Sequence, residues 1–169
     1  EIIPEFMEET GNRGGTVEGI GIGITGFVDF EKGALTKTAS LPKLNNFAVV
    51  DYLKSRLDQD IRIVMDNDCH CGALAEYRQG RRNMLYCPVS TGISSGMIID
   101  GRLFRGSNGA SGESGHMLAA VPEEVGMACS CGNVGCFNSL GSGKAILKYV
   151  KKWIKEDGES SILPELAGG

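Results

Sequence analysis

The chain has 169 residues, of which 41% are hydrophobic and 22% charged, and its formal net charge is −4. This length allows a hydrophobic core, and the acidic balance argues against a nucleic-acid-binding surface. Because no apolar run reaches the length of a membrane span and residues 1–15 lack the basic front and apolar centre of a signal peptide, we expect a cytoplasmic protein with reduced thiols.

Apolar residues recur with the period of a helix in some segments and of a strand in others, and turn residues separate these segments. The lysines of the last helical segment fall between its apolar residues and are interpreted as its solvated face. In chain order we predict a helix over 2–10, strands over 17–28 and 34–39, a helix over 48–57, a strand over 61–65, a helix over 72–79, strands over 84–90, 97–100 and 102–104, and a helix over 139–156.

Glycine alternates with isoleucine in the first predicted strand. This pattern fits a strand with one small-residue face that meets another backbone or a ligand. Two interpretations stay open. Either Gly23, Thr25 and Gly26 form the wall of a binding site, or the glycines allow the strand to pack closely against a helix.

Three polar residues, Asp66, Asn67 and Asp68, come directly after the predicted strand 61–65. A strand, an acidic loop and a helix in this order are typical of ligand sites in open α/β sheets. A carboxylate there can accept a hydroxyl proton while an asparagine orients the substrate, as phosphoryl transfer to an alcohol requires. From these residues alone, the favoured alternative is that Asp66 and Asp68 cap the following helix.

A turn rich in glycine and hydroxyl side chains lies between the predicted strands 84–90 and 97–100. Such a turn can present backbone N–H groups and hydroxyls to phosphate oxygens, although many turns share this composition. Thr91 and Gly92 are the candidate phosphate contacts.

Four candidate metal ligands lie close together within residues 112–138: His116, Cys129, Cys131 and Cys136. Thiolate and imidazole suit a tetrahedral zinc ion. The spacing is not the paired C-x-x-C of a zinc ribbon, so the prediction rests on residue type and clustering. Free cysteines in a glycine-rich turn, or a disulfide between two of them, are the alternatives. Because a closed four-ligand site leaves no position for water, the zinc would be structural.

The other cysteines, Cys69, Cys71 and Cys87, are most simply small side chains at buried or half-buried positions. The tract Cys69-His70-Cys71 also has the composition of a metal site. We disfavour that interpretation, because alternating cysteines that enter a helix point to opposite faces.

The segments GASGESGHM and CSCGNVGCFNS together resemble the signature of the ROK family of bacterial repressors and sugar kinases. The resemblance implies an actin-like ATPase (ribonuclease H-like) α/β fold, incomplete here and with a zinc-binding loop, because most of the chain matches the middle portion of the family pattern. Residues 1–80 would form the end of the N-terminal lobe with the catalytic loop. Residues 81–169 would begin the C-terminal lobe with the phosphate turn, the sugar and zinc loop and a helix. The family's D-x-G-G-T phosphate motif is not among these residues.

The stretch DNDCHCGALAE resembles the family motif E-N-D-A-N-A-A-A-L-G-E. This resemblance implies that Asp68 is the general base and that Asp68 and Asn67 contact the sugar. In the GESGHM segment it implies sugar contacts for Glu113 and His116, with His116 also a zinc ligand. With the resemblance, we favour catalysis over capping for Asp68.

The turn that contains Thr91 and Gly92 resembles the G-T-G-I-G-G-G phosphate loop of the family, which implies contacts with the nucleotide phosphates. Serines stand at positions 90, 94 and 95, where glycines are usual. Their hydroxyls can face phosphate, but the added side chains restrict close approach of the backbone.

Asn138 stands where the family has a glutamate directly after G-C-x, a residue that reaches a sugar hydroxyl. We therefore expect Asn138 to contact the substrate. An amide can hydrogen-bond a hydroxyl but cannot supply a carboxylate acceptor, so the affinity or the preferred sugar epimer should differ.

The resemblance predicts a glucokinase-like sugar kinase that transfers the terminal phosphoryl group of ATP to a hexose hydroxyl, with Mg²⁺ on the phosphates and structural Zn²⁺ in the loop. The expected partners are a hexose or related sugar, ATP and a second copy of the chain, with no membrane and no direct nucleic-acid binding. The alternatives are the sugar-binding effector domain of a ROK repressor and a non-catalytic fragment. Asp68 favours the kinase, because a domain that only senses sugar needs no base at the hydroxyl.

Overall fold

The computed structural model describes residues 2–57, 61–78, 81–119 and 128–156, together with residues 162 and 165. Helices and strands both occur within these ranges, which confirms the mixed α/β class. The longest described helix has 14 residues. None of the helices in the described part of the chain is long and apolar enough to cross a membrane.

The chain divides into two compact units, which are described separately here. Unit 1 comprises Glu1–Tyr86 and Gly96–Gly112, and unit 2 comprises Cys87–Ser95 and Glu113–Gly169. These units do not follow the lobe boundary expected at residue 80, because the segment Gly96–Gly112 joins the first unit. The division into lobes 1–80 and 81–169 stays a prediction.

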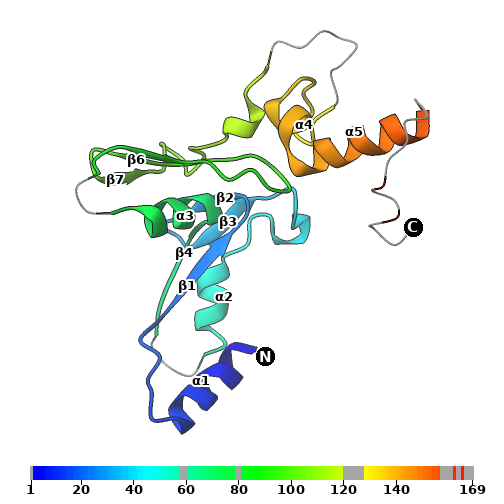
Figure 1. Ribbon diagram of the computed structural model, residues 1–169. Coiled ribbons are helices and arrows are strands. Elements are labelled where there is room, and N and C mark those ends of the chain that lie inside the picture. The colour runs from blue at the N-terminus through cyan, green and yellow to red at the C-terminus, as the bar shows by residue number, and fades with distance from the viewer. Residues whose placement is uncertain are drawn as a thin grey trace. The chain divides into compact units, whose positions relative to one another are not determined.

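Unit 1 is built from α1 (Ile2–Asn12), β1 (Gly19–Ile24), β2 (Phe27–Asp29), β3 (Ala34–Lys37), the 3₁₀ helix η1 (Pro42–Leu44), α2 (Val49–Lys54), β4 (Arg62–Asn67), α3 (Asp68–Glu76), β5 (Met84–Tyr86), β6 (Gly96–Ile99) and β7 (Arg102–Phe104) (Figure 1). β1 pairs in parallel with β4, and β2 pairs antiparallel with β3. β5, β6 and β7 form an antiparallel sheet, and β6 and β7 correspond to the predicted strands 97–100 and 102–104.

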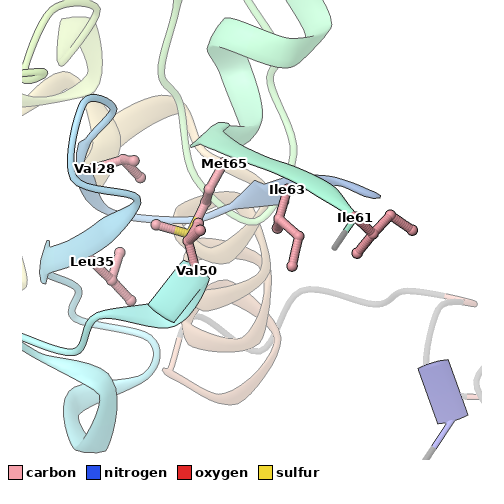
Figure 2. Close-up of a cluster of buried hydrophobic side chains, with 6 residues drawn as sticks. All are labelled: Val28, Leu35, Val50, Ile61, Ile63 and Met65. Carbon is pink, nitrogen blue, oxygen red and sulfur yellow. The ribbon is translucent and has the colours of Figure 1, made fainter. Parts of the chain in front are cut away.

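The core of unit 1 follows from the alternation of side chains along β4. Arg62 and Val64 are exposed, whereas Ile63 and Met65 are buried. Figure 2 shows the side chains of Ile63 and Met65 on the same side of β4, with Val50 of α2 beside Met65. Full burial of a side chain such as Met65 stabilises the fold by about 1.5–3 kcal/mol. The complete cluster is Val28, Leu35, Val50, Ile61, Ile63 and Met65.

The predicted loop between β4 and α3 does not exist. The strand continues through Asn67, and α3 begins at Asp68 rather than at residue 72. The reason is local: the side-chain oxygen of Asn67 accepts hydrogen bonds from the backbone N–H groups of Cys69 and His70, at 2.8 and 3.3 Å. A capped helix can follow the strand directly, because its first donors are already satisfied.

The predicted strand 17–28 is two strands, β1 and β2, with a break at Gly26. This residue has a φ of 119°, a conformation open mainly to glycine. A β-carbon there would lie 2.5 Å from the carbonyl oxygen of Lys37. The other predicted segments 34–39, 48–57 and 84–90 shorten to β3, α2 and β5, and α3 ends at Glu76; Gln79 lies outside the described residues.

Unit 2 contains the 3₁₀ helix η2 (Ser114–His116), α4 (Phe137–Gly141) and α5 (Gly143–Glu156). The single helix predicted over 139–156 was therefore wrong. Ser142 interrupts it with an extended backbone, at φ −73° and ψ 159°. The Ser142 hydroxyl accepts a hydrogen bond from the Ala145 N–H at 3.2 Å, which caps the start of α5.

Gly96 of β6 packs against α3 without room for a side chain. A β-carbon added there would lie 2.2 Å from the carbonyl oxygen of Cys69 and 2.7 Å from Cβ of Ala73. We expect Gly96→Ala to lower the free energy of unfolding by about 1–3 kcal/mol, because the backbone of α3 has to move. Gly21→Ala in β1 is the matched control, since nothing lies within 4 Å of its added β-carbon. Equal urea midpoints for the two variants would contradict this packing.

Candidate functional site

The junction between β4 and α3 lies beside the carboxyl end of β1. Asp66 and Asn67 pair with Gly23 and Ile24 of β1 in the parallel ladder. A β-carbon added to Gly23 would lie 3.5 Å from Sγ of Cys71 in α3. This is an ordinary van der Waals distance, so β1 lies against α3 with room for a β-carbon at Gly23, and the packing does not decide between the two sequence interpretations.

Asn67 forms the N-cap of α3. The alternative interpretation of the sequence had assigned the capping of this helix to Asp66 and Asp68. The side-chain oxygen of Asn67 accepts from two backbone N–H groups of α3, and its amide nitrogen donates to the carbonyl oxygen of Gly26 at 3.0 Å. Both lone pairs of the oxygen are thus used within the protein. If Asn67 contacts a sugar, its second amide N–H is the group that remains for it.

Asp68 is the first residue of α3, and its side chain is exposed. Its Oδ1 accepts a hydrogen bond from the neighbouring Cys69 N–H at 3.0 Å. Of the three polar residues at the junction, Asp66 is buried and Asn67 is half-buried. Asp68 is therefore the carboxylate at this junction that a substrate in solvent can reach.

Asp66 belongs to a buried charged network that the sequence did not predict. The Asp66 carboxylate accepts from His70 Nδ1 and from Arg105 Nε, both at 2.8 Å. His70 Nε2 lies 3.0 Å from the Ser111 hydroxyl oxygen, and that hydroxyl donates to the carbonyl oxygen of Phe104 at 2.6 Å. The network ties the end of β7 and the following loop to α3.

Both ring nitrogens of His70 have side-chain partners, Asp66 at Nδ1 and Ser111 at Nε2. His70 is 1% exposed and Asp66 is 6% exposed, so the buried Asp66 carboxylate depends on its hydrogen bonds with His70 and Arg105. With both ring nitrogens engaged in this way, His70 is not available to the metal tract that Cys69-His70-Cys71 suggested.

Burial raises the pKa of Asp66, but hydrogen bonds from His70, Arg105 and the Asn67 N–H outweigh it, so the net pKa lies below the ordinary value of 3.8. A lowered folded-state pKa means that ionised Asp66 stabilises the fold above the unfolded-state pKa, and that this stabilisation is lost as pH falls through the folded-state pKa.

We therefore expect the urea midpoint of the protein to fall as the pH is lowered from about 5 to about 3. In Asp66→Asn the urea midpoint should fall less between these pH values than in the wild type. Near neutral pH its midpoint should already be lower than that of the wild type, because His70 and Arg105 lose their charged partner. Asp51→Asn, at an exposed aspartate of α2, is the control. An unchanged acid response in Asp66→Asn would contradict the assignment.

The four predicted metal ligands come together in unit 2. The ligand atoms of His116, Cys129, Cys131 and Cys136 all lie within 4.8 Å of one another. Cys129 Sγ is 3.5 Å from His116 Nδ1, and Cys131 Sγ is 3.6 Å from Cys136 Sγ. Tetrahedral zinc with bonds of about 2.3 Å would separate two sulfurs by about 3.8 Å. The cluster therefore fits a four-coordinate zinc ion in ligand type and spacing.

The disulfide alternative does not hold, because none of the six cysteines, all of which lie in the described residues, forms a disulfide. The Sγ–Sγ distance of 3.6 Å between Cys131 and Cys136 is far longer than a disulfide bond of about 2.05 Å. Cys69 is buried and Cys71 is half-buried, as predicted, whereas Cys87 is exposed.

The protonation of the cysteines also suits a metal. A hydrogen bond from the backbone of Asn133 lowers the pKa of Cys131 to about 7, whereas burial and the neighbouring thiols raise the pKa of Cys136 to about 12. A buried thiol of this kind becomes a thiolate when a cation takes the place of its proton. Metal binding would therefore release protons and weaken as the pH falls.

The backbone of the metal loop is shaped by two positive-φ glycines, Gly132 at 97° and Gly135 at 81°. The Cys129 N–H donates to the Asn133 carbonyl oxygen at 2.8 Å, which closes a tight turn around Gly132. Glycine adopts these positive φ values readily, and the tight turn that results keeps the candidate ligands close together.

Glu113 lies next to the metal cluster through His116. While Nδ1 of His116 faces Cys129, its Nε2 lies 3.6 Å from a carboxylate oxygen of Glu113. A carboxylate on the far side of a ligating histidine orients the ring and raises its basicity. The structure thus places two of the predicted sugar contacts beside each other and beside the metal ligands.

The predicted phosphate contacts, Thr91 and Gly92, are exposed on a turn of unit 2. A bridge between Val89 and Ile93 closes this turn, and the Ser90 N–H donates to the Gly92 carbonyl oxygen at 2.9 Å. Asn138, predicted to contact sugar, accepts a hydrogen bond from the Ile93 N–H at 2.8 Å. Asn67 and Asp68 lie in unit 1, and the other predicted site residues lie in unit 2.

Sequence relatives of this chain include repressors and kinases. The chain is 34% identical over 167 residues to a xylose repressor of Caldicellulosiruptor bescii, which covers 96% of this chain and 40% of the repressor. It is 30% identical over 151 residues to a glucokinase of Halalkalibacterium halodurans, which covers 85% of this chain and 43% of the kinase. The chain thus spans about two fifths of the length of these relatives.

Among solved structures, the chain resembles a ROK family glucokinase from Streptomyces griseus in complex with glucose and AMPPNP, with a TM-score of 0.73 and 29% identity. The similarity covers 92% of this chain and 49% of the glucokinase chain. The sequence model of the ROK family matches residues 1–166. The match therefore extends well beyond the two motifs that carried the resemblance, and the chain belongs to the ROK family.

Proposed function

We propose that this chain carries the acceptor-sugar and catalytic part of an ATP-dependent sugar kinase. The observation that carries the proposal is the exposed carboxylate of Asp68, the first residue of α3, next to Asn67, whose side chain is fixed by hydrogen bonds. A rigidly held junction with one accessible carboxylate is what proton removal from a substrate hydroxyl requires.

In the proposed reaction, Asp68 accepts the proton of a sugar hydroxyl while the oxygen of that hydroxyl forms a bond to the terminal phosphorus of ATP. The bond between that phosphorus and the bridging oxygen breaks, and ADP leaves. Mg²⁺ would neutralise the phosphates, and Thr91 and Gly92 would offer N–H groups or a hydroxyl to phosphate oxygens. Glu113 and His116 would bind sugar hydroxyls, as would Asn67.

Zinc in the proposed protein has a structural role. His116, Cys129, Cys131 and Cys136 would hold it, and the closed ligand set leaves the chemistry to the side chains. Its contribution is to fix His116, which is also a proposed sugar contact. A hexose-phosphorylating homodimer in the cytoplasm, where thiols stay reduced, is part of the same proposal.

A second candidate is the effector domain of a sugar-responsive repressor, which binds sugar without turnover. The similarity to a xylose repressor favours it, as does the amide of Asn138 at a position where the family pattern has a carboxylate. On this alternative, Asp68 would hydrogen-bond a sugar hydroxyl without removing its proton.

The two candidates differ in turnover. We would incubate the full chain with MgATP and a panel of hexoses, pentoses and N-acetylated amino sugars, and follow ADP release, with sugar binding measured by calorimetry on the same samples. The kinase predicts ADP release that depends on one sugar or on a few related sugars. Binding of a sugar without ADP release would reject the kinase for this chain and favour the effector domain.

A further inference from the structure

The side chain of Asn138 is directed to the turn that carries the proposed phosphate contacts. Its Oδ1 accepts a hydrogen bond from the Ile93 N–H at 2.8 Å, and Ile93 is 4% exposed. A β-carbon on Gly92 would lie 3.4 Å from the same oxygen and 3.7 Å from Nδ2 of Asn138. The amide thus packs across the turn and holds one of its backbone donors.

Two further contacts secure the same turn. A β-carbon on Gly115, in η2, would lie 2.1 Å from the Ile93 carbonyl oxygen and 3.1 Å from Cγ of Asn138. At the other end, the Gly143 N–H donates to the Ser90 carbonyl oxygen at 2.8 Å. The turn is therefore held by Gly143 at the start of α5 and by the segment that carries His116.

The residues that hold the turn are sequence neighbours of metal ligands. Gly115 directly precedes His116, and Asn138 follows Cys136 by two residues. Cys136 is 0% exposed and is the N-cap of α4, and the Phe137 N–H donates to the Met117 carbonyl oxygen at 2.9 Å. An ion that fixes His116 and Cys136 would thereby also fix Gly115 and Asn138 against the turn.

We propose that Asn138 is a positioning residue through which metal binding orders the phosphate turn, rather than a residue that reads the sugar. The nucleotide part of this inference rests on the proposed kinase function; the link between the metal and the turn does not. A neutral amide is suited to position 138. It accepts a hydrogen bond from the Ile93 N–H without adding a negative charge beside Thr91 and Gly92, where phosphate would bind.

Hydrogen exchange of the Ile93 amide, measured by NMR on the full chain, tests the link directly. We expect exchange at Ile93 to become about tenfold faster in Asn138→Ala, and also in the wild type after the metal is chelated, because one hydrogen bond is lost or loosened. Asn138→Asp keeps an acceptor of the same reach and should restore protection. Asn133→Ala, at an exposed asparagine of the metal loop, is the matched control. The Met65 amide in the core of unit 1 reports in the same spectra whether the chain is folded.

Ligand affinities separate the two roles of Asn138. We expect Asn138→Ala to weaken MgATP binding by about tenfold and to leave sugar binding unchanged. Asn138→Asp should protect the Ile93 amide but bind MgATP more weakly than the wild type, since it adds a charge. Unaltered Ile93 exchange in both Asn138→Ala and the metal-free protein would overturn the proposal, as would a loss of sugar affinity alone. If Ile93 responds as expected but the wild type binds no MgATP, the metal-to-turn link stands and the kinase function fails.

Discussion

Removal of the metal is expected to lower the thermal unfolding midpoint by about 10 °C or more, because the free energy of metal binding adds to the stability of the folded state. Around the ligands, the described structure offers backbone turns and bridges such as Ala128–Val134 and Leu118–Cys136, with few buried apolar side chains. Chelation should therefore loosen the loop before the core of unit 1, which is built from residues outside unit 2.

The corresponding substitution is Cys136→Ser, which removes a buried thiol at the start of α4. It should lower both the zinc content and the unfolding midpoint, measured by elemental analysis and circular dichroism on the same sample. Cys87→Ser is the matched control, since Cys87 is exposed and lies outside the ligand cluster. A Cys136→Ser protein that keeps one zinc per chain and the wild-type midpoint would exclude Cys136 as a ligand.

Asp68→Asn is expected to lower kcat for sugar phosphorylation by about 10²- to 10⁴-fold, the usual contribution of a general base. The amide keeps the size and one oxygen of the carboxylate but cannot take a proton at neutral pH. The dissociation constant for the sugar should stay within about threefold of the wild-type value, because the hydrogen bonds to the bound substrate are largely kept.

The control for Asp68→Asn is Asp51→Asn, because Asp51 is also an exposed aspartate in the first turn of a helix. Turnover is measured by ADP release and binding by calorimetry. If Asp68→Asn turns over as fast as Asp51→Asn, the assignment of the base is wrong. If both turnover and sugar affinity collapse in Asp68→Asn, Asp68 is chiefly a binding residue.

Residue type and local order were enough to predict that the four candidate metal ligands lie together. His116 and the three cysteines are few, chemically distinctive and close in sequence, so that short glycine turns bring them together. The order of strand, D-N-D and helix around β4 and α3 was predicted for a similar reason, because it can be recognised within a dozen residues, although the predicted ends of the strand and the helix were wrong. Family membership, first inferred from the motifs around these two features, was confirmed over residues 1–166.

Other features depend on tertiary structure and were missed. Arg105 and Ser111 reach the pair of Asp66 and His70 from about 40 residues away, and nothing local marks them as partners. The i,i+4 spacing of Asp66 and His70 was a usable signal, but it needs a helix that starts at Asp68. That start was misplaced because the capping side chain proved to be Asn67 rather than an aspartate.

The break before α5 had a signal in the sequence. Ser142 lies between Gly141 and Gly143, and a glycine pair around a capping serine favours a new helix start over a continuous helix. No signal in the sequence predicted the role of Asn138, because its partner Ile93 lies 45 residues earlier in the chain.

Transfer of the phosphoryl group is the central claim, and ³¹P NMR of one sample tests it most directly. The zinc-loaded full chain would be mixed with MgATP and the sugar that supports ADP release. The kinase predicts that the terminal phosphate signal of ATP decays as a sugar phosphate monoester signal grows at the same rate. Decay into inorganic phosphate, or no decay in the presence of bound sugar, would contradict it.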